Sequence, residues 1–586
     1  MNTMASLVVP CHIPHTTIVN NSFACAFPAK SPSFLIRRRR CSKIACKSSD
    51  DVHEPTLDRR DVLLGLCGAA AAVGGLGVGS KPAFGSPITA PDLSKCGPAD
   101  LPNGVPVVNC CPPYSSTIRD FKLPPQSSPL RVRPAAHLVD ANYLAKYTKA
   151  VELMRALPAD DPRNFTQQAN IHCAYCDGAY EQIGFPDLEI QVHNSWLFLP
   201  WHRFYLYFHE RILGKLIGDE TFALPFWNWD APGGIQMPSI YTKKSSSLYD
   251  KLRDARHQPP ALVDLDFNGV DPGLPYPQQV DHNLKIMYRQ VVSGGKTPLL
   301  FMGSPYRAGD EPNPGSGSLE NIPHGPVHIW TGDSTQPNGE DMGNFYSAAR
   351  DPIFFAHHGN VDRVWYLWKK LGGRHRDFDD KDWLNASFLF YDENADLVRV
   401  TVKDCLETER LRYTYQDVEI PWLKSRPTPA KRAAAGTQRL GRPSASTAEA
   451  ARFPVVLNSP VSFTVKRPKL SRSGAEKEAE EEVLVVEGIE YDRDFFIKFD
   501  VFVNALEGTE GLTPGESEFA GSFVNVPHKH KHRKNEKKLK TGLRLGITDL
   551  LEDIGAEDDE SVLVTIVPRA GKGKASVAGI KIDFSK

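Results

Sequence analysis

The sequence predicts two folded parts, a mainly α-helical domain with long loops at residues 86–424 and a C-terminal β-sandwich or β-barrel at residues 453–586. Apolar residues recur at helical spacing in four stretches of the first part, whereas they alternate at strand spacing in the second. Between the two parts, residues 425–452 have few large apolar side chains and many Pro, Gly, Ser and Ala, as flexible and protease-sensitive linkers do. A chain of 586 residues is long enough for this arrangement.

The first part is expected to be a small helix bundle inside a loop-heavy domain. Residues 86–135 are rich in Pro and predict an irregular wrap, and residues 230–317 predict loops. Start and stop signals are clearest for the last helix, where Asp351 can cap the start, Pro352 takes the first position and two glycines end it. The four predicted helices span residues 135–157, 200–217, 321–330 and 351–371.

The second part is expected to be all β, because its apolar residues alternate in short runs that turn residues separate. The sequence contains no internal repeat. The predicted strands lie in VVLNSPVSFTV (455–465), EEVLVVEGIEY (481–491), FFIKFDVFVN (495–504), SVLVTIVP (561–568) and ASVAGIKIDF (575–584).

Residues 1–85 are predicted to be a targeting segment. The first 49 residues contain no Asp or Glu, and four consecutive arginines at 37–40 lie in Ser-rich sequence, which is typical of an organellar transit peptide. A twin-arginine pair then precedes the Ala/Gly-rich apolar run 62–79, as in translocation signals. A transmembrane helix is the alternative, but the run is at the short limit for spanning a bilayer. We expect delivery to the chloroplast thylakoid lumen, with cleavage near Gly85 and no stable membrane insertion.

The charge of the remaining chain gives no basis for nucleic-acid binding. The whole chain has 69 basic and 70 acidic residues, and residues 1–85 hold 10 of the basic and 5 of the acidic ones. The remainder therefore has 59 basic and 65 acidic residues and a net charge of -6. A mildly acidic protein has no reason to favour nucleic acid or anionic lipid. The cluster PHKHKHRKNEKK (527–538) is interpreted as a solvated basic loop, because its lysines and arginines repel metal cations.

Histidines are the residues that point to chemistry. Residues 191–210 place three of them among tryptophan and phenylalanine, and a buried imidazole is costly unless its lone pair is used. His324 and His328 are four apart, which places them on one face of a helical turn. A set of imidazoles without carboxylates suits copper or zinc. The zinc-protease pattern is absent, since His209-Glu210 is not followed by a second histidine at the required spacing.

Seven longer motifs surround these histidines or follow them in the chain. They are HCAYC (172–176), QVHNSWLFLPWHRFYL (191–206), NIPHGPVHIW (321–330), GEDMGNFYSAARDPIFFAHHGNVDRVW (339–365), DKDWLNASFLFYD (380–392), RYTY (412–415) and KFDVFVN (498–504). These motifs resemble those of plant polyphenol oxidases (catechol oxidases), which belong to the type 3 copper family. The resemblance covers essentially the whole chain, including the targeting signals.

The resemblance implies a four-helix bundle that holds two copper ions, with O₂ as co-substrate. One ion would be bound by three histidines from the first group and the other by three from the second. His357 would then be the member of its pair that does not bind copper. The implied ligands are His172, His193 and His202 for one ion and His324, His328 and His358 for the other.

The chain has eleven cysteines, of which six lie after residue 85. Disulfides would fit a compartment outside the reducing cytosol, but spacing alone does not give their connectivity. The resemblance implies the pairs Cys96–Cys111 and Cys110–Cys173, and a thioether between Cys176 and His193 that would fix the histidine ring. The alternative for Cys176 is a free buried thiol. Cys405 has no assigned partner and is interpreted as an ordinary buried cysteine.

Four further residues receive roles from the resemblance. Glu320 would hold a water near the coppers and assist deprotonation, although an acid at a solvated helix start is the alternative. Phe345 would be an aromatic gate over one copper, or a core residue. Asp362, one turn after His358, would orient that ligand or pair with an arginine. Gly325 stands where some monophenol-hydroxylating relatives have Asn, which favours oxidation of diphenols.

The resemblance implies that the protein oxidises o-diphenols to o-quinones. It also implies a latent enzyme in which the C-terminal domain shields the copper entrance until a protease cuts the chain at residues 425–452. Three alternatives stay open: a tyrosinase that hydroxylates monophenols, an oxidase specialised for one secondary metabolite, and an oxygen carrier. The plastid signals and plant-type motifs argue against the oxygen carrier. Small phenols and O₂ are the expected partners.

Overall fold

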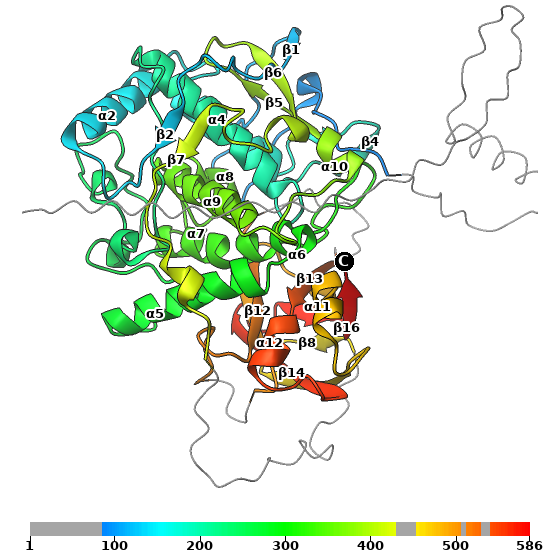
Figure 1. Cartoon of the computed structure of the whole chain (residues 1–586). Helices are drawn as coiled ribbons and strands as arrows, with labels where there is room; N and C mark the ends of the chain where they lie inside the picture. The colour runs from blue at the N-terminus through cyan, green and yellow to red at the C-terminus, as the bar shows by residue number, and fades with distance from the viewer. Residues whose placement is uncertain (1–84, 429–452, 506–510, 529–539) are drawn as a thin grey trace, which may run out of the picture. The chain divides into compact units, whose positions relative to one another are not determined.

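The computed structural model describes residues 85–428, 453–505, 511–528 and 540–586 (Figure 1). Contacts divide the chain into two units, Met1–Lys81 and Pro82–Lys586. The predicted targeting segment, apart from Gly85, and most of the predicted linker therefore lie outside the described residues, as does most of the basic cluster 527–538. No helix in the described ranges is long and apolar enough to cross a membrane.

The fold class expected from the sequence is confirmed, with a helical core followed by a β domain (Figure 1). The α-helices are α2 (Ala141–Ala156), α3 (Phe165–Cys176), α4 (Phe198–Leu216), α5 (Tyr276–Met287), α6 (Pro298–Met302), α7 (Gly325–Thr331), α8 (Phe345–Ala348), α9 (Ile353–Lys370), α10 (Lys381–Asn385), α11 (Gly474–Ala479) and α12 (Thr548–Asp553). Two π-helical turns are η5 (Tyr288–Ser293) and η6 (Glu320–His324), and short 3-10 turns are η1 (Leu93–Lys95), η2 (Pro232–Gly234), η3 (Ser239–Tyr241), η4 (Ala255–His257), η7 (Val402–Asp404) and η8 (Pro421–Lys424).

The four predicted helices correspond to α2, α4, the pair η6–α7, and α9. Local chemistry sets their ends: the Asp140 side chain accepts the Tyr143 N–H at the start of α2, and α9 ends before Gly372, whose φ of 72° suits glycine. The kink inside η6 lies at Ile322, which has extended backbone angles and precedes Pro323. This kink separates His324 from the preceding turn and lets α7 start in a new direction.

Helices α3 and α5 occur where the sequence predicted none. All residues of α3 except Thr166 and Gln167 are buried, including Gln168 and Asn170. A helix that is buried all round has no polar face, so its sequence lacks the periodicity of a surface helix. The side chain of Asn164 caps α3 by accepting the Thr166 N–H.

Two antiparallel sheets pack against each other in the C-terminal part, so it is the sandwich of the two predicted alternatives. One sheet has the order β12-β11-β14-β9, and the other has the order β13-β10-β15-β8 with β16 also paired to β10. The strands are β8 (Val455–Val456), β9 (Val461–Lys466), β10 (Glu481–Tyr491), β11 (Ile497–Val503), β12 (Phe519–Asn525), β13 (Thr541–Gly546), β14 (Ser561–Ala570), β15 (Ala575–Val577) and β16 (Gly579–Ser585). Strands β12 and β13 were not predicted.

Small sheets tie distant parts of the helical domain together. Strands β1 and β2, from the N-terminal wrap, pair in parallel with β6 and β7 near the end of this domain. Their bounds are β1 (Ile118–Asp120), β2 (Arg131–Arg133), β3 (Glu181–Gln182), β4 (Phe185–Glu189), β5 (Ser387–Tyr391), β6 (Leu397–Thr401) and β7 (Tyr413–Tyr415).

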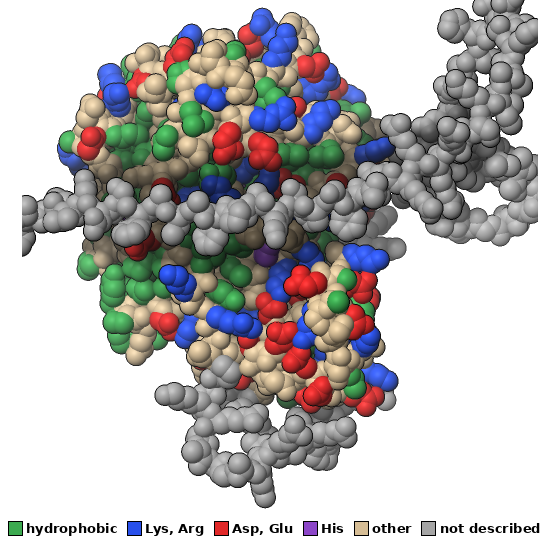
Figure 2. Space-filling view, in the orientation of Figure 1, with side chains coloured by type: hydrophobic (Ala, Val, Ile, Leu, Met, Phe, Trp, Pro, Cys, Tyr) green, Lys and Arg blue, Asp and Glu red, His purple; other side chains and the backbone are tan. Residues whose placement is uncertain are grey.

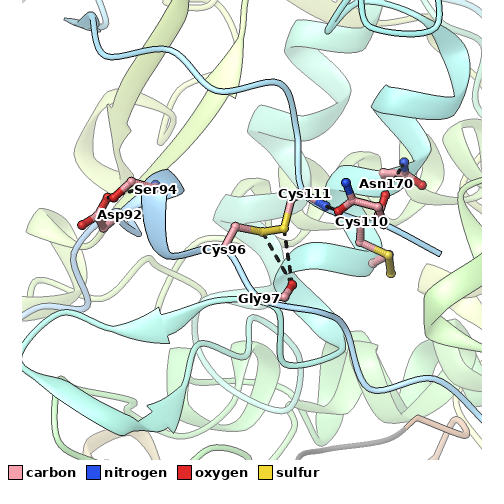
Figure 3. Close-up of a disulfide and its surroundings, with 9 residues drawn as sticks. Asp92, Ser94, Cys96, Gly97, Cys110, Cys111 and Asn170 are labelled. Carbon is pink, nitrogen blue, oxygen red and sulfur yellow. Dashed lines mark hydrogen bonds between the residues drawn. A yellow bond between two sulfur atoms is a disulfide. The ribbon is translucent and has the colours of Figure 1, made fainter. Parts of the chain in front are cut away.

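Two disulfides fasten the N-terminal wrap, Cys96–Cys111 and Cys110–Cys173, the same pairs that the resemblance implies. The Gly97 carbonyl oxygen lies 3.3 Å from Sγ of Cys111, and the wrap is also held by Asn170, whose amide donates to the Asn109 carbonyl at 3.2 Å (Figure 3). Because Cys173 lies on α3, the second disulfide connects the wrap directly to a helix of the core.

The helical domain and the β-sandwich share one apolar core, which includes Phe502, Phe519 and Val524 beside the tryptophans of the helices. Acidic and basic side chains are interspersed over the face drawn in Figure 2, as expected from the small net charge.

Candidate metal centre

The six histidines that the sequence singles out come together in the helical core. His172 lies on α3, His202 on α4 and His193 in the segment before α4. His324 ends η6, His328 lies on α7 and His358 on α9. Their exposed fractions are all 2% or less.

The rings form two sets of three that face each other. In the first set, the ring centroid of His193 lies 5.1 Å from that of His172 and 5.0 Å from that of His202. In the second set, those of His324 lie 4.6 Å from His328 and 5.0 Å from His358. Between the sets, His202 and His358 stack with centroids 4.2 Å apart and ring planes at 8°.

Backbone carbonyls set the tautomer of four rings. The Nδ1 atom of His172 contacts the Phe345 carbonyl at 2.8 Å, and that of His328 contacts the Met342 carbonyl at 2.8 Å. The Nδ1 atoms of His202 and His324 contact the carbonyl four residues earlier, at 2.8 and 3.2 Å, in the second case across the kink at Ile322. A carbonyl only accepts, so each Nδ1 carries the proton and each Nε2 keeps a lone pair for a metal ion.

The environment keeps the histidines neutral. Burial lowers the pKa of His172 to about 3 and that of His328 to about 4. Burial, with neighbouring histidines as a further cause, lowers the pKa of His193, His324 and His358 well below the ordinary value. Neutral imidazoles bind metal, whereas protonated ones do not.

His193 is held differently from those four rings. Among the residues that the structure describes, neither ring nitrogen of His193 has a hydrogen-bond partner, and its ring stacks on Phe345 with centroids 4.1 Å apart. Cys176 is a free, buried thiol here, and its sulfur lies within 4.8 Å of ring nitrogens of His172 and His193.

A fourth histidine, His357, lies against the second set. One nitrogen of each of His324, His328, His357 and His358 lies within 4.8 Å of the others. Proximity therefore does not separate ligand from non-ligand in this set. A hydrogen bond distinguishes His357 from the other three, because Trp229 donates its indole N–H to Nδ1 of His357 at 3.2 Å.

Glu320, four residues before His324, is buried rather than solvated. One carboxyl oxygen accepts the N–H of Asn194, the residue after His193, at 2.7 Å, and within the described residues the other lies beyond hydrogen-bond geometry of any donor. Burial raises the pKa of Glu320 to about 8. The carboxyl group can therefore exchange a proton near neutral pH.

Phe345 lies between the first set and the β domain. One face of its ring stacks on His193, and it also stacks on His528 with centroids 4.8 Å apart. Its N–H donates to the Pro527 carbonyl at 3.3 Å. No sequence pattern pointed to His528, which belongs to the cluster interpreted as a solvated loop but is itself buried.

Asp362 binds arginines, which is the second of the two roles that the sequence allows. Its carboxylate accepts from Arg203 at 2.5 Å and Arg133 at 3.1 Å, and from the hydroxyls of Tyr413 and Tyr415. Although burial alone would raise it, these arginines hold the pKa of Asp362 below its ordinary value. No hydrogen bond joins it to His358, whose Nδ1 has no partner in the described part of the chain.

Gly325 is in close contact with the β domain. A Cβ atom at this position would lie 2.7 Å from Cγ1 of Val524 on β12. The backbone N–H of Val524 also donates to the Asn321 side chain at 3.1 Å. Strand β12 thus packs on the turns that carry His324 and His328.

Three family models match the chain. The common central domain of tyrosinase matches residues 162–371, the polyphenol oxidase middle domain matches residues 377–428, and the C-terminal domain of chloroplastic polyphenol oxidase matches residues 453–584. The first match contains all six candidate ligands.

The chain is 58% identical to "Polyphenol oxidase, chloroplastic" of Malus domestica, over 94% of this chain and 93% of the relative. It is 52% identical to "Aureusidin synthase" of Antirrhinum majus, over 93% of this chain and 98% of the relative. The structure of latent apple tyrosinase superposes with a TM-score of 0.74 and 59% identity, covering 80% of this chain and 100% of that one.

Proposed function

Because the chain belongs to the plant polyphenol oxidase family, whose central domain is the tyrosinase domain with a type 3 copper pair, we propose that it oxidises o-diphenols to o-quinones while O₂ is reduced to water. The observation that carries this proposal is the pair of facing three-histidine sets. Two buried sets of neutral imidazoles suit two copper ions better than any hard cation, which would need oxygen ligands.

We assign one copper to His172, His193 and His202 and the other to His324, His328 and His358. The residues fit this role because Nε2 of His172, His202 and His324 is buried without a hydrogen-bond partner. In the second set, Nε2 of His328 and Nε2 of His358 lie 3.2 Å apart, so they can share an ion. Bound copper would supply the exchange of electrons between the diphenol and O₂.

The protein would move protons and exclude water. Glu320 would accept a proton from a diphenol hydroxyl, directly or through a water, since one carboxyl oxygen is uncommitted and burial raises its pKa into the working range. Phe345 would cover the first set, where its ring already lies on His193. A thioether from Cys176 would hold the one ligand ring, His193, that lacks a hydrogen bond on both nitrogens.

We also propose that the full chain is latent. The carbonyl of Pro527, the ring of His528 and strand β12 cover Phe345 and Gly325 from the β domain. A catalytic domain at 86–424, a cleavable linker at 425–452 and a shielding domain at 453–586 would allow a protease to activate it. The similarity to the latent apple tyrosinase supports this.

For localisation, the proposal is the thylakoid lumen of the chloroplast. The Malus domestica relative is named chloroplastic, and the predicted twin-arginine signal adds the lumenal step.

Catechols are the favoured substrates, because Gly325 offers no side-chain amide to orient a phenol-activating water. The similarity to the aureusidin synthase is the specific observation for the alternative of a specialised biosynthetic oxidase. A substrate panel separates the two: one strongly preferred phenol would favour the specialised enzyme.

The decisive experiment is metal analysis and an oxygen-uptake assay with catechol, on the full chain and on protein cut within 425–452. We expect two copper ions per chain in both forms and faster turnover after cleavage. Zinc at full occupancy, or reversible O₂ binding without quinone formation, would refute the assignment.

A further inference from the structure

The adjacent residues His357 and His358 are both close enough to the second set to bind its ion. Both rings are fully buried, and a nitrogen of each lies within 4.8 Å of those of His324 and His328. Four imidazoles thus compete for an ion that needs three. The question of which of these histidines bind the ion arises only if the site binds copper, so the inference rests on the proposed function.

Hydrogen bonding to Trp229 removes the ambiguity. An indole N–H is a donor only, so Nδ1 of His357, which receives it at 3.2 Å, must be the acceptor. A neutral imidazole has one proton, which is then on Nε2. His357 therefore has no lone pair on Nε2 for an ion, and its other nitrogen is occupied by the Trp229 indole.

The segment that carries Trp229 is fixed to α9 on both sides of His357. The Trp227 N–H donates to the carbonyl of Ala356, the residue before His357, at 2.8 Å. The carboxylate of Asp230, the residue after Trp229, accepts from Asn360 at 2.9 Å and from Arg363 at 3.0 Å. Trp229 has no exposed surface. The indole is thus held in place from one end of this short segment to the other, and it cannot leave His357 without breaking these contacts.

We propose that Trp229 is a positioning residue that locks His357 in the Nε2–H tautomer and so keeps it out of the copper site. The stacked contact between His357 and His324, with centroids 5.4 Å apart, then braces a ligand ring without competing for its ion. Loss of the indole N–H would release Nδ1 of His357 to take the proton and would free Nε2 to bind copper.

The test uses the copper-loaded full chain and three variants. Trp229→Phe removes the indole N–H, and Trp227→Phe is the matched control, because the Trp227 indole donates only to the carbonyls of Gly234 and Gln236. His357→Gln keeps an acceptor and a donor but offers no imidazole lone pair. The readouts are copper content, the rate of copper loss to a chelator, and the number of imidazoles per copper from X-ray absorption.

We expect wild type, Trp227→Phe and His357→Gln to hold two coppers with about three imidazoles each. Trp229→Phe should also hold two coppers, but the average number of imidazoles per copper should rise toward about 3.5. This variant should lose copper no faster than wild type, and its turnover of catechol should be at least about tenfold slower. Faster copper loss with an unchanged imidazole count would mean that Trp229 only packs, and loss of one copper in His357→Gln would mean that His357 is a ligand. Either result overturns the inference. A wild type without copper would instead refute the proposed function.

Discussion

Arg203 on α4 and Asp362 on α9 are joined by a buried ion pair, with Nε and Oδ1 2.5 Å apart. Arg203 follows His202 directly, and Asp362 lies one helical turn after His358. The stacked rings of these two histidines bridge the two sets, so the ion pair fixes the helices that hold the sets at their separation. The metal centre is thus supported by a charged network behind it.

Asp362→Asn should therefore be strongly destabilising. It leaves the guanidinium group of Arg203 buried with only a neutral partner and removes one of the two carboxylates that Arg133 pairs with, and breaking a buried pair costs about 3–5 kcal/mol. The measurement is the free energy of unfolding from urea titration. Asp120→Asn is the control, because its pair with Arg399 is largely exposed and contributes about 0–1 kcal/mol. Equal effects of the two variants would contradict the expectation.

Acid should weaken the same network. Burial acts to raise the pKa of Glu210, but Arg133 and Arg131 hold this pKa below its ordinary value, as arginines do for the pKa of Asp362. A lowered folded-state pKa gives stability that is present above the unfolded-state pKa of about 4 and is lost as pH falls below it. Unfolding midpoints measured from pH 7 to pH 3 should drop on the acid side, and Glu210→Gln should flatten that drop. A drop that starts above pH 6 would point to other groups.

Glu320→Gln should slow turnover without removing copper. A positioned base contributes about 10²- to 10⁴-fold, and glutamine cannot accept the diphenol proton. Linker-cleaved protein should show the loss in kcat at unchanged copper content. Glu152→Gln on α2 is the matched control, since this carboxylate is half exposed. A variant with wild-type kcat would remove Glu320 from the mechanism.

The thioether can be tested by mass. Peptides that contain Cys176 and His193 should be found joined, at the summed mass less two hydrogen atoms, in protein expressed with copper. After denaturation, Cys405, which is also free and buried, should react with a thiol reagent while Cys176 does not. Alkylation of both cysteines would show that Cys176 stays a thiol.

Gly325→Ala should loosen the latent state. The added methyl group would lie 2.7 Å from Val524, whose β-branched side chain cannot easily turn away, and overpacking of this kind costs about 1–3 kcal/mol. The uncut variant should oxidise catechol faster than the uncut wild type. Adding Val524→Ala makes room and should restore latency. If the single variant stays as inactive as wild type, β12 does not shield the site at Gly325.

The sequence allowed prediction of those elements whose own residues signal them. The Asp351 side chain accepts the Ile353 N–H at the start of helix α9, which a proline precedes and glycines follow, and β10 contains the run of strand-forming residues Val483–Val486. Helix α3 was missed because all of it except Thr166 and Gln167 is buried, and the edge strand β12 was missed because it is buried on both faces and its residues do not alternate with polar ones. Periodicity reports a solvent-facing side, which these elements lack.

The site was predicted as a set of residues, but its hydrogen bonds were not. The resemblance of their motifs implies the histidines as ligands, whereas the partner of Nδ1 of His172, the Phe345 carbonyl, comes from a segment 173 residues away in the chain. Trp229 carried no signal, because its partner is 128 residues away. The role of Asp362 likewise depended on arginines that local spacing does not reveal.

The cover over Phe345 has a consequence for maturation. The rings that would bind the ions are 2% exposed or less, and Pro527, His528 and β12 lie over Phe345 and Gly325 beside them. If this cover closes the approach, loading precedes docking of the sandwich or the sandwich lifts transiently. The order of assembly, rather than affinity alone, would then decide how much newly made protein acquires its copper.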